Sequence, residues 1–309
     1  MTLDGHRPSL TRLSDESKNG FGSRLGYAAR AHSTITDHKE VVTQMTGNAQ
    51  AWRESIVHVA STDLTFIKGG TGRPLLLLHE ELGHPGWLRW HAALAQGHTL
   101  YIPLHPGFGT SPRVEWVSSV RDLACFYARV VQDMGLSPID VIGFSLGGWI
   151  AAEMAANCGQ QFRRMVLVAP AGIRPPEGDI MDMFTVSARA YLNASVHDPA
   201  QTSEFALLYG GAQTPEQFEA WEEARAETAR IAWRPYLYNP SLGPLLEGVR
   251  GLPTLVLWGR QDKIVPLSTG QSYNRSITGS ELAVFEGCGH RPEIEHAPEF
   301  IERVQQFLT

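Results

Sequence analysis

Short apolar runs alternate with helical patterns along the chain from about residue 56 onward. A strand covered on both faces has a continuous apolar sequence, so runs of this kind bounded by turn residues predict buried strands. Such strands are expected at 56–60, 64–67, 75–79, 100–103, 139–144, 165–169, 254–258 and 282–285. Strands that alternate with helices predict an α/β fold with a largely parallel sheet and helices on both faces.

The alternation stops between Ala169 and Thr254. Apolar residues at helical spacing there predict helices at 181–193, 203–208 and 215–231 instead of strands. A helical insertion of this size between two strands is expected to form a lid over the carboxyl edge of the sheet. The predicted organisation is a core of residues 54–170 and 250–309, with a helical cap over residues 171–249.

Residues 1–53 differ from the rest in composition. They are rich in Ser, Thr, Asn, Gly, Asp and Lys, and their few apolar residues keep no steady period. Such a segment buries too little apolar surface to offset its ordering entropy. A flexible or loosely docked extension is expected, and a lid or an oligomerisation arm is the alternative.

The net charge and the cysteine content of the chain limit the classes of partner and the compartment that it fits. Lys and Arg number 26 against 32 Asp and Glu, a formal net charge of −6, whereas phosphate contacts with nucleic acid need concentrated Lys and Arg. No apolar run reaches the roughly 20 residues that span a bilayer. The three cysteines are too few and too scattered for a disulfide scaffold, and the first residues lack the apolar stretch of a secretory signal. We expect a cytoplasmic protein with a small-molecule substrate, no nucleic-acid or membrane partner, and an oligomeric state that leaves a homodimer open.

The strongest chemical signal is Gly143-Phe144-Ser145-Leu146-Gly147, where a predicted strand meets a predicted helix. A Gly-x-Ser-x-Gly sequence at such a junction makes a sharp turn that lifts the serine hydroxyl clear of the sheet. Glycines are needed there because Cβ atoms would clash. The helix start also places the Leu146 N–H near any oxyanion formed at Ser145. The pattern predicts that Ser145 is a nucleophile.

A serine nucleophile needs a base that is held by an acid. Asp262 and His290 each follow a predicted strand, and Ser, Asp, His is the chain order that accompanies this elbow. Because the carboxyl ends of parallel strands meet at one edge of a sheet, the three side chains are expected to converge. The sequence therefore predicts a Ser145–His290–Asp262 triad that works without a cofactor.

The chain resembles the α/β-hydrolase superfamily through four motifs in order: Pro106-Gly107-Phe108-Gly109-Thr110-Ser111, Ser145 in its elbow, Asp262 after Trp258-Gly259, and His290 after Gly289. The resemblance extends from about residue 56 to the end. It implies a central eight-stranded, mostly parallel sheet whose second strand is antiparallel. It also implies that the cap shapes the substrate pocket.

The loop after the third strand departs from the family pattern. Members commonly have His-Gly-x-x-Gly there, whereas this chain has His79-Glu80-Glu81-Leu82-Gly83. The resemblance makes the Glu81 N–H the second oxyanion donor, yet a carboxylate beside a developing oxyanion opposes it in a dry site. Either the Glu81 side chain turns to solvent or to a cationic partner, or it takes part in substrate recognition or proton transfer.

The same loop does not predict a metal site. In His-Glu-x-x-His the ligands lie at i and i+4 on one helix face, but Gly83 holds the i+4 position after His79 and the run follows a strand. Further candidates for substrate binding are Glu80, Trp87, Phe144, Trp149 and His105. Core packing is the alternative for the three aromatic residues, and a turn position is the alternative for His105.

Three functions fit these observations. The first is a cofactor-independent serine hydrolase of a small or medium carboxylic ester. The second uses the same triad to cleave a C–C bond in vinylogous diketones, as ring-cleavage-product hydrolases do, and the run Val168–Ile173 is loosely similar to that group. The third is a ligand-binding protein that keeps the pocket but turns over slowly.

Overall fold

The computed structural model describes residues 41–42 and 52–309. The predicted extension over residues 1–53 lies outside the described residues except at four positions. Val41–Val42 and Trp52–Arg53 are strand residues. Strand pairing and the stacking of Trp52 on Trp87, with ring centroids 6.0 Å apart, bring these residues into the fold.

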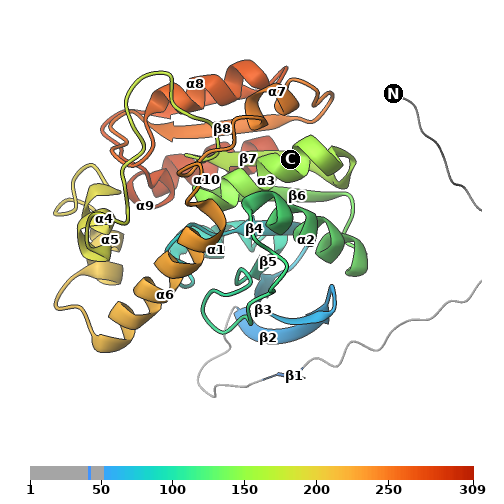
Figure 1. Cartoon of the computed structure of the whole chain (residues 1–309), viewed down its shortest axis with the longest axis horizontal. Helices are drawn as coiled ribbons and strands as arrows, with labels where there is room; N and C mark the ends of the chain where they lie inside the picture. Colours follow the sequence, from blue (N-terminus) through green and yellow to red (C-terminus); the bar gives the residue numbers. More distant parts are fainter. Residues whose placement is uncertain (1–40, 43–51) are drawn as a thin grey trace, which may run out of the picture. The chain divides into compact units, whose positions relative to one another are not determined.

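A single mixed sheet organises the described chain (Figure 1). Its strands are β1 (Val41–Val42), β2 (Trp52–Val59), β3 (Thr62–Gly70), β4 (Arg73–Leu78), β5 (His98–Pro103), β6 (Ile139–Phe144), β7 (Phe162–Val168), β8 (Thr254–Gly259) and β9 (Glu281–Phe285). Their spatial order is β1-β2-β3-β5-β4-β6-β7-β8-β9. β3 is antiparallel to β2 and β5, and every pair from β5 to β9 is parallel. Apart from the two-residue β1, this is the predicted eight-stranded sheet with an antiparallel second strand.

Helices cover both faces of the sheet, since nearly every residue of β4, β6, β7 and β8 is buried. The helices are α1 (Arg89–Leu94), α2 (Val120–Asp133), α3 (Leu146–Cys158), α4 (Ala188–Ala194), α5 (Ser203–Tyr209), α6 (Pro215–Ala232), α7 (Leu242–Leu246), α8 (Leu267–Ser276), α9 (Pro292–Glu295) and α10 (Ala297–Leu308). α1 packs on α10, while α2, α3, α7 and α8 pack side by side in that order. The predicted α/β fold class is confirmed.

The segment between β7 and β8 forms four helices, α4 to α7. Figure 1 shows α4, α5 and α6 grouped at one side of the sheet, while α7 packs against α3 and α8. α6 begins at a capping box in which Thr214 and Gln217 bond each other's backbone, with Pro215 at the first helical position. The helix predicted from residue 181 begins only at Ala188, and the residues before it form an irregular stretch in which Met181 N–H donates to Ile264 O at 2.8 Å.

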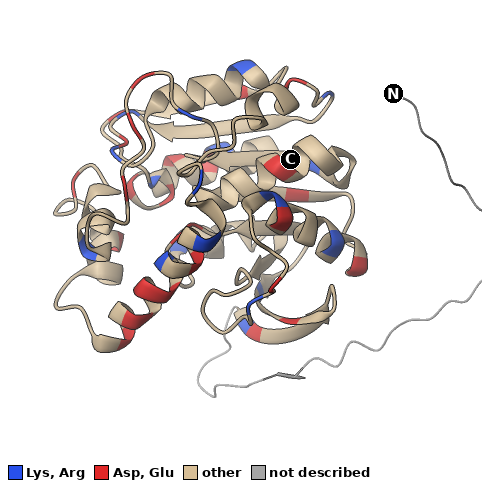
Figure 2. Cartoon of the chain, viewed as in Figure 1, with Lys and Arg blue, Asp and Glu red and all other residues tan. Residues whose placement is uncertain are grey.

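Surface charge and helix length bear on the partner classes. Acidic and basic residues are interspersed along the chain in Figure 2, and α6 carries both kinds. None of the helices in the described ranges has the length and apolar character that crossing a bilayer requires.

Candidate active site

Ser145 lies in the sharp turn between β6 and α3. Its backbone has φ 47° and ψ −110°, a conformation that strains a residue with a side chain. A Cβ at Gly143 would lie 2.4 Å from Gly147 O, and one at Gly147 would lie 2.1 Å from Leu78 O. Both positions therefore require glycine. Leu146 is the first residue of α3, so its N–H has no partner within the helix and points to the helix start.

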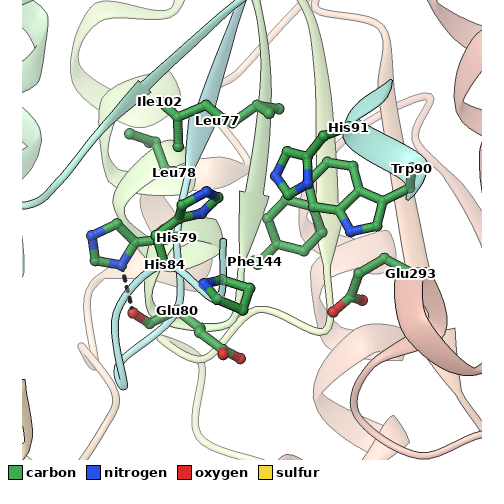
Figure 3. Close-up of a pocket in the computed structure, with 11 residues that line it drawn as sticks. Leu77, Leu78, His79, Glu80, His84, Trp90, His91, Ile102, Phe144 and Glu293 are labelled. Atoms are coloured by element: carbon green, nitrogen blue, oxygen red, sulfur yellow. Dashed lines mark hydrogen bonds between the residues drawn. The ribbon is translucent and has the colours of Figure 1, made fainter. Parts of the chain in front are cut away.

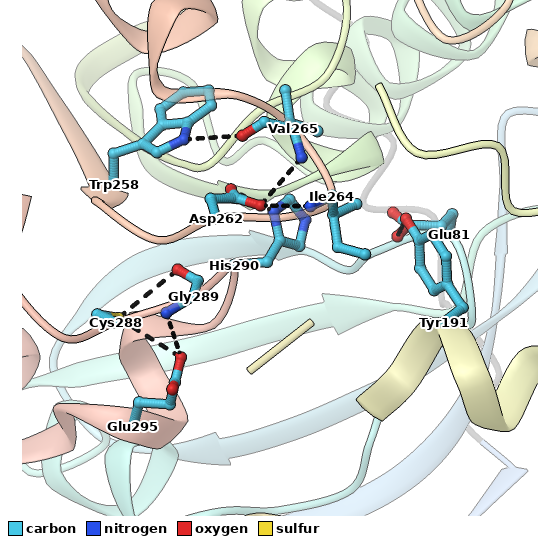
Figure 4. A network of polar contacts seen from close by, with 10 residues as sticks. All are labelled: Glu81, Tyr191, Trp258, Asp262, Ile264, Val265, Cys288, Gly289, His290 and Glu295. Atoms are coloured by element: carbon cyan, nitrogen blue, oxygen red, sulfur yellow. Dashed lines mark hydrogen bonds and ion pairs between the residues drawn. The ribbon is translucent and has the colours of Figure 1, made fainter. Parts of the chain in front are cut away.

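Asp262 and His290 are joined by a hydrogen bond at the same edge of the sheet (Figure 4). His290 Nδ1 donates to Asp262 Oδ2 at 2.7 Å, and both side chains are at most 2% exposed. The other carboxylate oxygen accepts from the N–H groups of Ile264 and Val265, at 2.8 and 2.9 Å. The backbone N–H of His290 donates to Ser195 O at 2.8 Å. The acid is thus fixed by its own loop, and the imidazole is fixed by the acid and by the chain after α4.

The second ring nitrogen of His290 is available for proton transfer. Nε2 is buried and has no hydrogen-bond partner among the described residues. Burial alone would lower the pKa of His290, but the carboxylates of Asp262, Glu81 and Glu80 outweigh it and raise the pKa to about 9. The ring is therefore an imidazolium at neutral pH in the substrate-free site.

Glu81 points into the site and is 2% exposed. Tyr191 of α4 donates to its Oε1 at 2.6 Å, and Thr228 of α6 donates to its backbone oxygen at 2.9 Å. Burial raises the pKa of Glu81, but the charge of His290 and hydrogen bonds from the Tyr191 and Ser145 side chains bring it below its usual value. Glu81 is therefore a buried carboxylate. The interpretation that turned it to solvent is wrong, because α4 and α6 cover it.

The cationic partner in this loop belongs to Glu80. Arg291 and Glu80 form an ion pair in which the side chains are 2% and 9% exposed. Arg291 Nη1 also donates to the hydroxyl of Tyr209 in α5 at 3.2 Å. Burial raises the pKa of Glu80, and the guanidinium of Arg291 offsets part of that effect. The two neighbouring glutamates therefore differ, since Glu80 is paired with a cation and Glu81 is bound by hydroxyls.

Two histidines hold the loop after β4. The N–H of His105 donates to His79 Nε2 at 2.9 Å, so His79 carries its proton on Nδ1 and donates to Glu80 O at 2.8 Å. His105 Nε2 donates to His79 O at 3.0 Å, which leaves its Nδ1 to accept from the Tyr127 hydroxyl at 2.6 Å. Burial lowers the pKa of His79 to about 4. His105 is therefore a buried support of the loop, and its backbone oxygen accepts from the Phe108 N–H at 2.8 Å, as in a turn.

A small pocket lies beside this loop (Figure 3). Of the predicted binding residues, Glu80 and Phe144 line it. Trp149 is instead a buried residue of α3, where its Nε1 donates to Glu153 at 3.2 Å, and Trp87 packs against the core. The other lining residues are Leu77, Leu78, His79, His84, Pro85, Trp90, His91, Ile102 and Glu293.

Three side chains that shape the charge of the site were not predicted. They are Tyr191, which bonds Glu81, Arg291, which pairs with Glu80, and Glu293 of α9. Burial raises the pKa of Glu293 to about 8, so this carboxyl is largely neutral at pH 7. Arg291 is the residue after the predicted base His290, and Glu293 is three residues after His290. This closeness in sequence was the one sign that the two side chains belong to the site.

The described residues contain no group of three His, Cys, Asp or Glu side chains arranged to hold a metal ion. Both ring nitrogens of His79 are used in hydrogen bonds within the protein. The chemistry that this arrangement can support is proton transfer between a serine hydroxyl and an imidazole held by a carboxylate.

Comparisons with known proteins agree with this geometry. A family model described as "Alpha/beta hydrolase family" matches residues 75–303. The 2-hydroxymuconate semialdehyde hydrolase of Pseudomonas sp. (strain CF600) is 30% identical over 254 residues, 78% of this chain and 88% of that protein. A 2-hydroxy-6-oxononadienedioate/2-hydroxy-6-oxononatrienedioate hydrolase of Klebsiella pneumoniae is 29% identical over 248 residues, 74% of this chain and 83% of that protein.

Structural similarity points to the same fold. The solved 2-hydroxy-6-oxo-6-phenylhexa-2,4-dienoate hydrolase of Rhodococcus sp. strain RHA1 superposes with a TM-score of 0.66 at 20% identity, over 83% of this chain and 98% of that one. The family match covers most of the sheet and its helices, and the named relatives are hydrolases. The chain belongs to the alpha/beta hydrolase family and is a hydrolase of that family.

Proposed function

We propose that the protein is a serine-dependent C–C bond hydrolase that cleaves beside the 6-oxo carbonyl, ketone or aldehyde, of a 2-hydroxy-6-oxo dienoate. The observation that carries the proposal is the 30% identity over 78% of the chain to a relative named 2-hydroxymuconate semialdehyde hydrolase. The site is compatible with it, because Asp262 and His290 are already bonded and His290 Nε2 has no partner among the described residues.

The proposed roles follow from the geometry. Ser145 Oγ attacks the carbonyl carbon while His290 Nε2 takes the hydroxyl proton, and Asp262 stabilises the imidazolium. The N–H groups of Leu146 and Glu81 are the proposed oxyanion donors, each worth about 3 kcal/mol. Collapse breaks the C–C bond, and His290 returns the proton to the departing carbon. Water, deprotonated by His290, then attacks the acyl group on Ser145.

Residues 171–249 are proposed to act as the cap of this site. Tyr191 of α4 and Thr228 of α6 both bond Glu81, which lies on the loop after β4. Two helices of the segment therefore reach the group next to the nucleophile. Contacts of this kind exclude water from the reacting atoms.

Hydrolysis of a carboxylic ester is the second candidate. The same triad attacks an ester carbonyl, and one observation favours this substrate. The Glu81 carboxylate beside Ser145 is more compatible with an uncharged ester than with an anionic dienoate.

A direct comparison of substrates tests the two candidates. We expect kcat/KM for a chromogenic 2-hydroxy-6-oxo dienoate to exceed that for p-nitrophenyl butanoate by at least about tenfold, which corresponds to 1.4 kcal/mol of transition-state binding. Loss of the dienoate absorbance and release of p-nitrophenolate are the two readouts. The opposite ranking would favour the ester, and turnover of neither compound would contradict both candidates.

The proposed base also predicts a pH dependence. Because the pKa of His290 is raised to about 9, the neutral ring that accepts the serine proton is scarce at pH 7 and increases with pH. We expect kcat/KM to rise by about tenfold per pH unit below the pKa and to level off above it. Initial rates between pH 6 and 10 in buffers of equal ionic strength give the profile, and a flat profile from pH 6 to 9 would contradict the prediction.

A further inference from the structure

The Glu81 carboxylate lies at the point where the scissile carbonyl is proposed to bind. Its hydrogen-bonding groups are the Tyr191 hydroxyl, the Ser145 side chain and its own backbone N–H. Two of these, Ser145 and the Glu81 N–H, are the groups that the proposed mechanism directs at the carbonyl carbon and oxygen. A substrate carbonyl therefore binds next to this carboxylate.

The charge of Glu81 is not matched by a dedicated cation. Arg291 is committed to Glu80 and Tyr209, and His290 is bonded to Asp262. Tyr191 stays a neutral donor, because burial raises its pKa well above the ordinary value. Both nearby cations, His290 and Arg291, are thus held by another carboxylate, and Glu81 is left with hydroxyl and N–H donors.

The negative charge of Glu81 is less compensated during catalysis than in the substrate-free site. His290 must be neutral when it accepts the proton of Ser145, so its positive charge is absent at the moment of attack. A carboxylate on the substrate then meets Glu81 in a covered site, where like charges repel far more strongly than in water. An uncharged acyl group meets no such opposition.

We propose that Glu81 is a specificity-determining residue that excludes a negative charge close to the scissile carbonyl. The inference rests on the proposed function and narrows it to dienoates with an uncharged ketone end, such as 6-phenylhexa-2,4-dienoates. It excludes the nonadienedioates, in which the ketone carbon belongs to a succinyl group whose carboxylate is three carbons away. Relatives named for substrates with and without the second carboxylate match this chain. Their names therefore do not decide between the two substrate classes, and the inference rests on the residues of the site.

The test compares acyl groups that differ in charge at similar length. Ethyl butanoate and monoethyl succinate are assayed by pH-stat at pH 8, and the 2-hydroxy-6-oxo heptadienoate and nonadienedioate are assayed by absorbance. Since juxtaposed like charges cost several kcal/mol, we expect the wild-type enzyme to favour the uncharged member of each pair by at least about 100-fold in kcat/KM. Equal kcat/KM values within a pair would overturn the inference.

Two substitutions at Glu81 separate the effect of its charge from the effect of its size and shape. Glu81→Gln keeps the size and removes the charge, and it is expected to lower the preference at least about tenfold. Glu81→Asp keeps the charge and is expected to retain the preference, whatever the absolute rate. A preference in Glu81→Gln equal to that of the wild type would contradict the role of Glu81.

Tyr191→Phe gives a third readout that does not depend on the Glu81 variants folding. Loss of the Tyr191 hydrogen bond raises the pKa of Glu81, so on acidification the preference should weaken at a higher pH in this variant than in the wild type. The same pH response in both proteins would count against the inference. If esters show the preference but dienoates are not cleaved, only the proposed function fails. If dienoates are cleaved without the preference, only the inference fails, and turnover of neither pair contradicts both.

Discussion

Replacing Ser145 with alanine is expected to lower kcat by about 10⁶ for ester and dienoate alike. The variant lacks the oxygen that forms the acyl intermediate, so His290 and the oxyanion donors have no nucleophile to assist. Single-turnover assays with enzyme in excess measure the residual rate. An organophosphonate probe that labels the wild-type enzyme at Ser145 should leave the variant unlabelled.

Two controls make this result specific. Alanine accepts φ 47° no worse than serine, so Ser145→Ala should fold, with a far-UV circular dichroism spectrum that matches that of the wild type. Asp262→Asn keeps the side chain in place but favours the wrong imidazole tautomer, and is expected to cost about 10⁴ in kcat. Residual activity near the wild-type level in Ser145→Ala would remove Ser145 from the mechanism.

Short stretches of sequence were sufficient to predict single strands, the start of α3 and the turn that holds Ser145. The strand at 139–144 matches β6, and the helix predicted from Leu146 begins there because the glycines of the elbow allow the chain to turn sharply. Asp262 and His290 were predicted to lie together because the carboxyl ends of parallel strands meet at one edge of a sheet. The parallel pairs β7–β8 and β8–β9 meet that condition. The antiparallel second strand came from the family resemblance and not from periodicity.

Contacts between distant residues were not predictable in the same way. Tyr191 and Glu81 are 110 residues apart, and Arg291 and Glu80 are 211 apart, so no local pattern links them. Only the docking of α4 and α5 onto the sheet edge decides that Glu81 meets a hydroxyl and Glu80 a guanidinium. The irregular stretch before α4 likewise makes a backbone contact with the distant loop before α8.

The Glu80–Arg291 pair leads to the largest expected effect on stability. Glu80→Gln removes the carboxylate that is paired with the buried Arg291 guanidinium, and a guanidinium cannot lose its proton. Breaking a buried pair from one side costs about 3–5 kcal/mol of unfolding free energy. Urea unfolding followed by tryptophan fluorescence measures the loss.

Arg291→Met should behave differently, because a carboxyl group can take up a proton. Without Arg291 the pKa of the buried Glu80 rises further, so the folded state holds a neutral acid where the unfolded chain, with a pKa near 4.5, is ionised. The loss of stability is therefore small at pH 5 and grows as the pH rises toward 8. The double variant Glu80→Gln/Arg291→Met buries no charge at this position and should be more stable at pH 8 than either single variant. If its loss equals the sum of the single losses, the two side chains do not act as a pair.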